Sequence, residues 1–207
     1  MYGQIPKEDV AKNVNKWYDS NNLTKSIKQE FETRGIDISK PLSTNNLKDN
    51  QFVTSSGLTE LDVPLYGQEK DYYCAPASGQ MIASYYNKDQ TQDYIYGIMD
   101  EGDGGGVSYS SQVDYYRATN GCDKPGSDDV DPSFATVVSE IDAGRPMVSG
   151  IDTSLGNPHV RVCRGYTTTM YGLRYLSIND PWPVGDGDQY LENWGTTNHV
   201  TDIIVKD

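Results

Sequence analysis

The sequence has 207 residues, enough for one domain with an extension and for a sizeable hydrophobic core. Its formal net charge of −13 argues against nucleic acid or an anionic membrane surface as a partner, because phosphates attract Lys and Arg. No apolar run approaches the roughly 18 residues that a membrane-spanning helix needs. We therefore expect no membrane insertion.

Residues 1–57 are expected to form a helical N-terminal extension. Apolar residues at helical spacing indicate one helix over 8–18 and a second from Asn22 to Gly35, followed by a polar, turn-rich segment. These helices either pack on the following domain or form a pro-segment. The N-terminus lacks the apolar core of a signal peptide. We expect an extracytoplasmic protein if a leader is missing from this sequence, which the abundance of Tyr, Gly, Asn, Ser and Thr favours, and a cytoplasmic protein otherwise.

Residues 58–207 are expected to form one domain whose helices come first. Alternation of apolar and polar residues over 61–68 suggests a short strand. A helix is expected from Cys74, where Pro76 fits the first turn and apolar residues follow at helical spacing, namely Ala77, Met81, Ile82 and Tyr85. A further short helix is expected over 109–118.

One more helix and then a series of strands complete the domain. Asp131 is expected to cap a helix that has Pro132 at its first position and ends at Gly144. Segments rich in β-branched and aromatic residues follow and predict strands, over 146–151, 159–166, 173–179 and 199–205. The turn at Tyr171-Gly172 joins the second and third of these strands as a hairpin. Helices followed by antiparallel strands predict an α+β fold.

Cys74 is the first candidate for chemistry, because it opens a helix. Unpaired amides and the helix dipole favour negative charge there, which lowers a thiol pKa. A nucleophile also needs a base and a group that orients the base. In the predicted hairpin the start of one strand meets the end of the next, so His159 and Asp180 become neighbours. The Gln68 side chain can donate to a developing oxyanion, together with the backbone N–H of Cys74.

The same residues resemble a known family. The patterns Q-x5-C-A-P-A-S, H-V-x-V and N-D-P-W are similar to those of papain-like cysteine peptidases related to the domain that trims double-glycine leaders from bacteriocin precursors. The resemblance covers about Leu61 to Asp207. It implies a papain-like fold in which the nucleophile helix packs on the C-terminal antiparallel sheet.

The resemblance also implies a role for each candidate residue. Cys74 would be the nucleophile, His159 the general base, Asp180 the orienting group and Gln68 part of the oxyanion hole. Ala75 stands where the family usually has glycine. No transporter segments accompany the domain, so leader trimming is not the predicted role.

Each candidate also has a simpler structural interpretation. Cys74 can be a small buried hydrophobic residue, His159 a surface residue, Asp180 a turn former and Gln68 a surface glutamine at a strand end. The other histidine, His199, is interpreted as structural. The remaining thiols either form a disulfide or stay free together with Cys74, namely Cys122 and Cys163.

The sequence therefore predicts a thiol-dependent hydrolase that cleaves peptide or amide bonds in a peptide or protein substrate. No Cys/His spacing fits zinc, and the acidic clusters do not fit a twelve-residue calcium loop, so we expect no cofactor and no metal. The alternatives are a non-catalytic module that binds peptide or wall polymer, and an acyl or peptidyl transferase. The oligomeric state is left open.

Overall fold

The fold is that of a computed structural model, which describes residues 56–99, 105–153, 158–169 and 172–207. The helices expected over 8–18 and 22–35 lie outside the described residues, so the division into an extension and a domain stays a prediction. The first described element, strand β1 (Ser56–Glu60), contains the boundary expected between residues 57 and 58.

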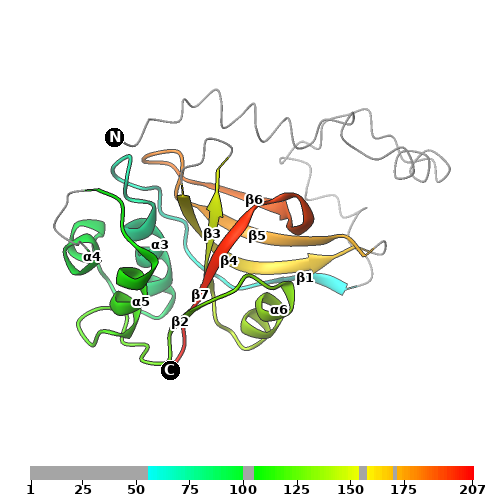
Figure 1. The fold of residues 1–207 in the computed structure, drawn as a ribbon, viewed down its shortest axis with the longest axis horizontal. Coiled ribbons are helices and arrows are strands. Elements are labelled where there is room, and N and C mark those ends of the chain that lie inside the picture. The colour runs from blue at the N-terminus through cyan, green and yellow to red at the C-terminus, as the bar shows by residue number, and fades with distance from the viewer. Residues whose placement is uncertain (1–55, 100–104, 154–157, 170–171) are drawn as a thin grey trace. The chain divides into compact units, whose positions relative to one another are not determined.

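Three helices gather beside the sheet: α3 (Cys74–Tyr85), α4 (Gln92–Met99) and α5 (Tyr109–Arg117) (Figure 1). The helix predicted from Cys74 is confirmed, and so is the helix over 109–118, which ends one residue early. The sequence did not predict α4. Its eight residues bury only three side chains, too few to show a helical period, and these are Gln92, Ile95 and Met99.

Among the described residues, seven strands form one antiparallel sheet in the order β2-β7-β3-β4-β5-β6, and β1 pairs with β4. The four predicted strands are confirmed, with bounds shifted by one or two residues. After β1, the strands are β2 (Asp128–Val130), β3 (Met147–Asp152), β4 (Pro158–Thr168), β5 (Arg174–Asp180), β6 (Asp188–Asn193) and β7 (His199–Ile204).

The long strand β4 organises the sheet. One of its edges pairs with β5, as the predicted hairpin requires. Its other edge pairs with β3 along residues 158–163 and with β1 along residues 165–168. The strand expected over 61–68 is wrong, because sheet pairing ends at Glu60 and Pro64 has no N–H to donate to a ladder.

Helix α6 (Phe134–Asp142) begins later than predicted. Its N-cap is Ser133, whose side chain accepts a hydrogen bond from the backbone N–H of Thr136. The prediction that Asp131 caps the helix is therefore wrong, and Pro132 precedes the first turn. Serine is as good a capping residue as aspartate, so the sequence pattern alone did not separate the two positions.

Helices cover both faces of the sheet. Neighbouring strand residues divide between two apolar clusters, because side chains alternate from one face to the other. Val162 joins the cluster that holds Met81 of α3, while Cys163 joins the cluster that holds Phe134 of α6. The expected packing of the helix that begins at Cys74 on the antiparallel sheet is confirmed, and it brings the start of α3 toward β4.

Candidate active site

The N-terminus of α3 presents the Cys74 thiol in a position that favours negative charge. The N-cap residue, Tyr73, makes no side-chain capping hydrogen bond, and the first turn contains no acidic residue. Pro76 has no N–H, so it removes one amide that would otherwise need a partner. The Ser78 hydroxyl donates to the Val160 carbonyl of β4 over 3.4 Å, which fixes the helix start against the strand.

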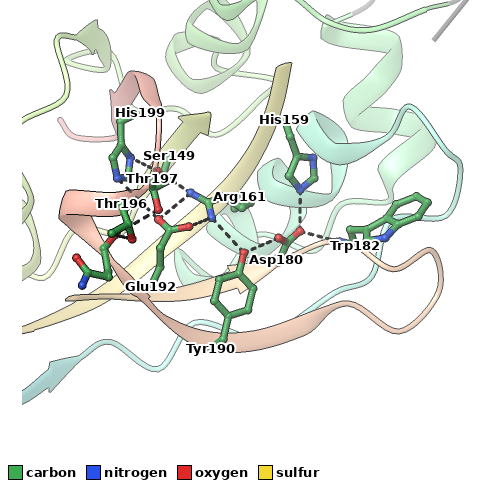
Figure 2. A network of polar contacts seen from close by, with 11 residues as sticks. Ser149, His159, Arg161, Asp180, Trp182, Tyr190, Glu192, Thr196, Thr197 and His199 are labelled. Carbon is green, nitrogen blue, oxygen red and sulfur yellow. Dashed lines mark hydrogen bonds and ion pairs between the residues drawn. The ribbon is translucent and has the colours of Figure 1, made fainter. Parts of the chain in front are cut away.

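The β4–β5 hairpin brings His159 and Asp180 together, at the end of the sheet where β4 begins. Val162 pairs with Asn179 in the register. His159 precedes Val162 on β4 and Asp180 follows Asn179 on β5, so both lie beyond this pair at the same end of the sheet. His159 Nε2 lies 2.8 Å from Asp180 Oδ1 (Figure 2). The two side chains are only 17% and 13% exposed, so solvent screens their contact weakly.

Cys74 and His159 form a coupled pair. Burial on its own raises the pKa of the Cys74 thiol, because it disfavours the thiolate. The hydrogen bond and the positive charge of His159 outweigh burial, and the pKa ends below its ordinary value. Backbone hydrogen bonds from Ala75 and Val160 act in the same direction. Both partners therefore favour a thiolate facing an imidazolium.

The pKa of the His159 imidazole shifts in the opposite direction to that of the Cys74 thiol. Burial on its own lowers the pKa of His159, but the charge and hydrogen bond of Asp180 raise it, and the contact with Cys74 adds to the rise. The pKa of His159 therefore lies above its ordinary value. A protonated His159 has two ring N–H groups, one to donate to the carboxylate and one for the thiolate, which is the arrangement that an activated cysteine needs.

Three groups hold the Asp180 carboxylate. Oδ1 accepts from His159 and, over 2.9 Å, from the backbone N–H of Trp182. Oδ2 accepts from the Tyr190 hydroxyl over 2.7 Å (Figure 2). Burial raises the pKa of Asp180, but His159 and Arg161, with the Trp182 N–H, bring it below its ordinary value. Sequence reasoning missed Tyr190, because β6 carries no alternating pattern that would mark it as a strand.

Gln68 is anchored beside this site. Its backbone N–H donates to the Pro181 carbonyl over 2.8 Å, directly after Asp180 in the chain. Its side-chain Nε2 donates to the Lys70 carbonyl over 2.8 Å, and the N–H of Tyr73 donates to that same carbonyl. The amide group thus lies next to the residue that precedes Cys74, and one N–H of Nε2 is left for another acceptor. Its role in an oxyanion hole stays a prediction.

The other histidine and the other thiols lie elsewhere. His199 stacks on Trp194 with 4.0 Å between ring centroids, and its Nδ1 is 3.5 Å from Ser149 Oγ. Cys122 and Cys163 are both free, so the disulfide alternative is wrong. Burial raises the pKa of Cys122 to about 11 and that of Cys163 to about 12, so both are protonated thiols near neutral pH.

Two absences apply to the part of the chain that the structure describes. No group of three His, Cys, Asp or Glu side chains there is arranged to hold a metal ion. No helix within those ranges combines the length and the apolar character needed to cross a membrane.

The α+β architecture, with a cysteine at a helix N-terminus against an antiparallel sheet, is that of the papain-like cysteine peptidases. The model of the Peptidase_C39 like family matches residues 60–201, and the chain belongs to this family. The expected relationship to bacteriocin-processing peptidases is thereby confirmed. No curated protein matches the sequence.

Two solved structures are similar. One is the peptidase domain of Streptococcus ComA, a bi-functional ABC transporter involved in a quorum sensing pathway. It is 16% identical with a TM-score of 0.51, and the match covers 69% of this chain and 98% of that one. The other is the proform of the ragweed pollen cysteine protease Amb a 11. It is 12% identical with a TM-score of 0.49, over 77% of this chain and 69% of that one.

Proposed function

We propose that the chain is a thiol-dependent hydrolase, a cysteine peptidase or a related amidohydrolase, acting through Cys74, His159 and Asp180. The observation that carries the proposal is the buried contact of His159 Nε2 with Asp180 Oδ1 at 2.8 Å, at the start of the strand against which the N-terminal turn of α3 is held. The hydrogen bond and charge of His159 that lower the Cys74 pKa support the extension of this arrangement to the thiol. The opposite shifts of the Cys74 and His159 pKa values support the same assignment.

In the acylation step the Cys74 thiolate attacks the carbonyl carbon of a peptide or amide bond. A C–S bond forms and the carbonyl π electrons move to oxygen. The backbone N–H of Cys74 and the side chain of Gln68 are proposed to donate to this oxyanion. His159 then gives its proton to the leaving nitrogen, the C–N bond breaks, and a thioester remains on Cys74.

In the deacylation step His159 accepts a proton from water as the water oxygen attacks the thioester carbon. The C–S bond breaks, the carboxylic acid leaves, and the Cys74 thiolate faces a protonated His159 again. Asp180 stays ionised throughout. It orients the ring of His159 and stabilises the imidazolium form. The family implies a peptide substrate, and these steps require no cofactor.

Thiol reactivity tests the proposal before any substrate is known. We expect brief iodoacetamide treatment near neutral pH to label Cys74 at least about a hundredfold faster than Cys122 or Cys163, as resolved by peptide mass spectrometry. The two buried thiols are internal controls with raised pKa values. Because their burial also slows reagent access, the deciding quantity is the pH dependence for Cys74 itself. Its rate should reach half-maximum below the ordinary thiol pKa.

A midpoint at or above the ordinary thiol pKa would contradict the proposal. A peptide library then separates the remaining classes of function. Cleavage by the intact protein that stops in a Cys74→Ala variant supports hydrolysis. An amide product formed with an added primary amine indicates a transferase. Binding that is unchanged in Cys74→Ala, without any turnover, indicates a non-catalytic module.

A further inference from the structure

The second oxygen of the Asp180 carboxylate is held by a group that the proposed mechanism does not use. Oδ1 serves His159 and the backbone N–H of Trp182, whereas Oδ2 receives the Tyr190 hydroxyl at 2.7 Å. Tyr190 lies on β6, the strand next to the one that carries Asp180. A hydrogen bond to an ionised carboxylate is roughly twice as strong as one between neutral groups.

The direction of this hydrogen bond is fixed by its neighbours. Arg161 Nη1 lies 3.1 Å from the Tyr190 hydroxyl oxygen. A guanidinium can only donate and an ionised carboxylate can only accept, so the hydroxyl accepts from Arg161 and donates to Asp180. Burial and the charge of Asp180 raise the pKa of Tyr190 well above its ordinary value, which keeps the donated proton in place.

Arg161 is itself immobilised. Its side chain is 1% exposed. Nη1 and Nη2 form an ion pair with the two oxygens of Glu192, and Nη2 also lies 3.5 Å from Ser149 Oγ (Figure 2). A guanidinium that forms a bidentate pair with a carboxylate is held in one orientation. The Tyr190 hydroxyl is therefore held at the end of a rigid, buried chain of polar contacts.

The hydrogen bond from Tyr190 restricts rotation of the Asp180 carboxylate. A carboxylate held through one oxygen can rotate about its C–C bond and lose alignment with the imidazole. It would also leave a buried oxygen without a donor, which costs about 1–3 kcal/mol. With Tyr190 present, both oxygens are engaged, and the lone pair that faces His159 is fixed in direction.

We propose that Tyr190 is a positioning residue of the candidate active site: its hydroxyl, oriented by Arg161, locks the ionised carboxylate of Asp180 toward His159. The inference rests on the proposed function, because it concerns how His159 is kept protonated opposite Cys74. It gives β6 a part in holding the candidate site, through Tyr190.

The test is the pH profile of Cys74 alkylation in the full chain, in wild type and in Tyr190→Phe, which removes one oxygen and keeps the ring. Loss of the hydroxyl weakens the hold of Asp180 on the imidazolium, and the imidazolium then stabilises the thiolate less. We expect the midpoint of the profile to rise by about 0.5–1 pH unit. On its acidic side, the alkylation rate should fall about threefold to tenfold.

Tyr166→Phe is the matched control. The Tyr166 hydroxyl also donates to an aspartate, Asp142 Oδ1, over 2.8 Å, and Tyr166 lies in the same sheet far from Cys74 along β4. This variant should keep the wild-type midpoint. If Tyr190→Phe lowers the melting temperature and leaves the midpoint unchanged, Tyr190 only stabilises the fold and the inference is overturned.

The profile of the wild type separates this inference from the function on which it rests. A wild-type midpoint at the ordinary thiol pKa overturns the proposed function and the inference together. A lowered midpoint that is identical in Tyr190→Phe overturns the inference alone. If Tyr190→Phe does not fold, Arg161→Lys decides: a single ammonium cannot grip Glu192 and orient Tyr190 as the fork does, so the midpoint should rise in the same direction. An unchanged midpoint in that variant overturns the inference.

Discussion

The surroundings of the two histidines differ in one respect that reverses the behaviour of the imidazole. Both rings are largely buried in the same sheet, and each has a carboxylate nearby. His159 lies 2.8 Å from Asp180 and its pKa is raised. His199 Nε2 lies 3.8 Å from Glu192, and burial lowers the pKa of His199 to about 4, against the opposing charge of Glu192.

The difference lies in what else the carboxylate contacts. Glu192 is already paired with Arg161, which neutralises it and also repels a second cation. The charge of Arg161 also acts on Asp180, but the two side chains form no ion pair, and Asp180 accepts instead from His159, the Trp182 N–H and the Tyr190 hydroxyl. In this chain the histidine with the raised pKa is therefore the one whose carboxylate forms no ion pair with an arginine.

The largest expected effect separates the two histidines directly. In His159→Ala the thiolate loses its counter-ion, and we expect the alkylation rate of Cys74 near neutral pH to fall about a hundredfold. Any peptide hydrolysis should fall about a thousandfold or more. His199→Ala is the matched variant and should change the alkylation rate by less than about twofold. Equal losses in the two variants would contradict the distinction.

The second prediction removes the arginine that makes the two sites differ. Arg161→Met leaves Glu192 buried without its partner, so we expect a loss of about 3–5 kcal/mol in the free energy of unfolding at about pH 8, measured with urea. Glu192 can then pair with a protonated His199, and the pKa of His199 should rise. The loss should therefore be smaller at about pH 5.

Arg117→Met provides the control for that prediction. Arg117 pairs with Asp128 over 3.2 Å, and the two side chains are 45% and 58% exposed. Because solvent and water-accessible rotamers compensate more easily there, we expect a loss of only about 1 kcal/mol. If the free energy of unfolding falls by the same amount in the two arginine variants at both pH values, the buried pair of Arg161 and Glu192 does not determine the pKa of His199.

The smallest effect concerns Asp202, which lies opposite Ser149 in the register and is 1% exposed. Burial raises its pKa to about 7, against the effects of Arg161 and Ser149. A raised pKa in the folded state means that its contribution to stability is complete below the unfolded pKa of about 4 and is lost as the pH rises through about 7.

Asp202→Asn cannot ionise, so this loss should disappear. We expect the variant to be more stable than wild type by about 2 kcal/mol at about pH 8 and nearly equal at about pH 4, from urea unfolding. A difference between Asp202→Asn and wild type that does not vary with pH would contradict the assignment.

Local patterns in the sequence were sufficient for the elements that carry Cys74, His159 and Asp180. Helical spacing located α3, and the content of β-branched and aromatic residues located β4 and β5. Antiparallel register then placed His159 beside Asp180, because a hairpin aligns the start of one strand with the end of the other.

The remaining parts depend on tertiary contacts that leave little local pattern. Tyr190 lies on β6, a strand whose first two residues are exposed and whose sequence does not alternate. The choice of Ser133 over Asp131 as the cap was decided by where α6 packs, since either residue can cap a helix. The contact between Arg161 and Glu192, which sets the behaviour of His199, joins residues 31 positions apart.

Strand β4 carries both the histidine that contacts Asp180 and the arginine that contacts Glu192, and this has a further consequence. His159 and Arg161 stand two positions apart on this strand, so one register places the first against Asp180 and the second against Tyr190 and Glu192. A slip by one residue would turn both side chains to the opposite face at once. A molecule with the slipped register would lose both sets of contacts together, so the fraction of Cys74 that alkylates with the lowered pH midpoint would count the correctly assembled molecules.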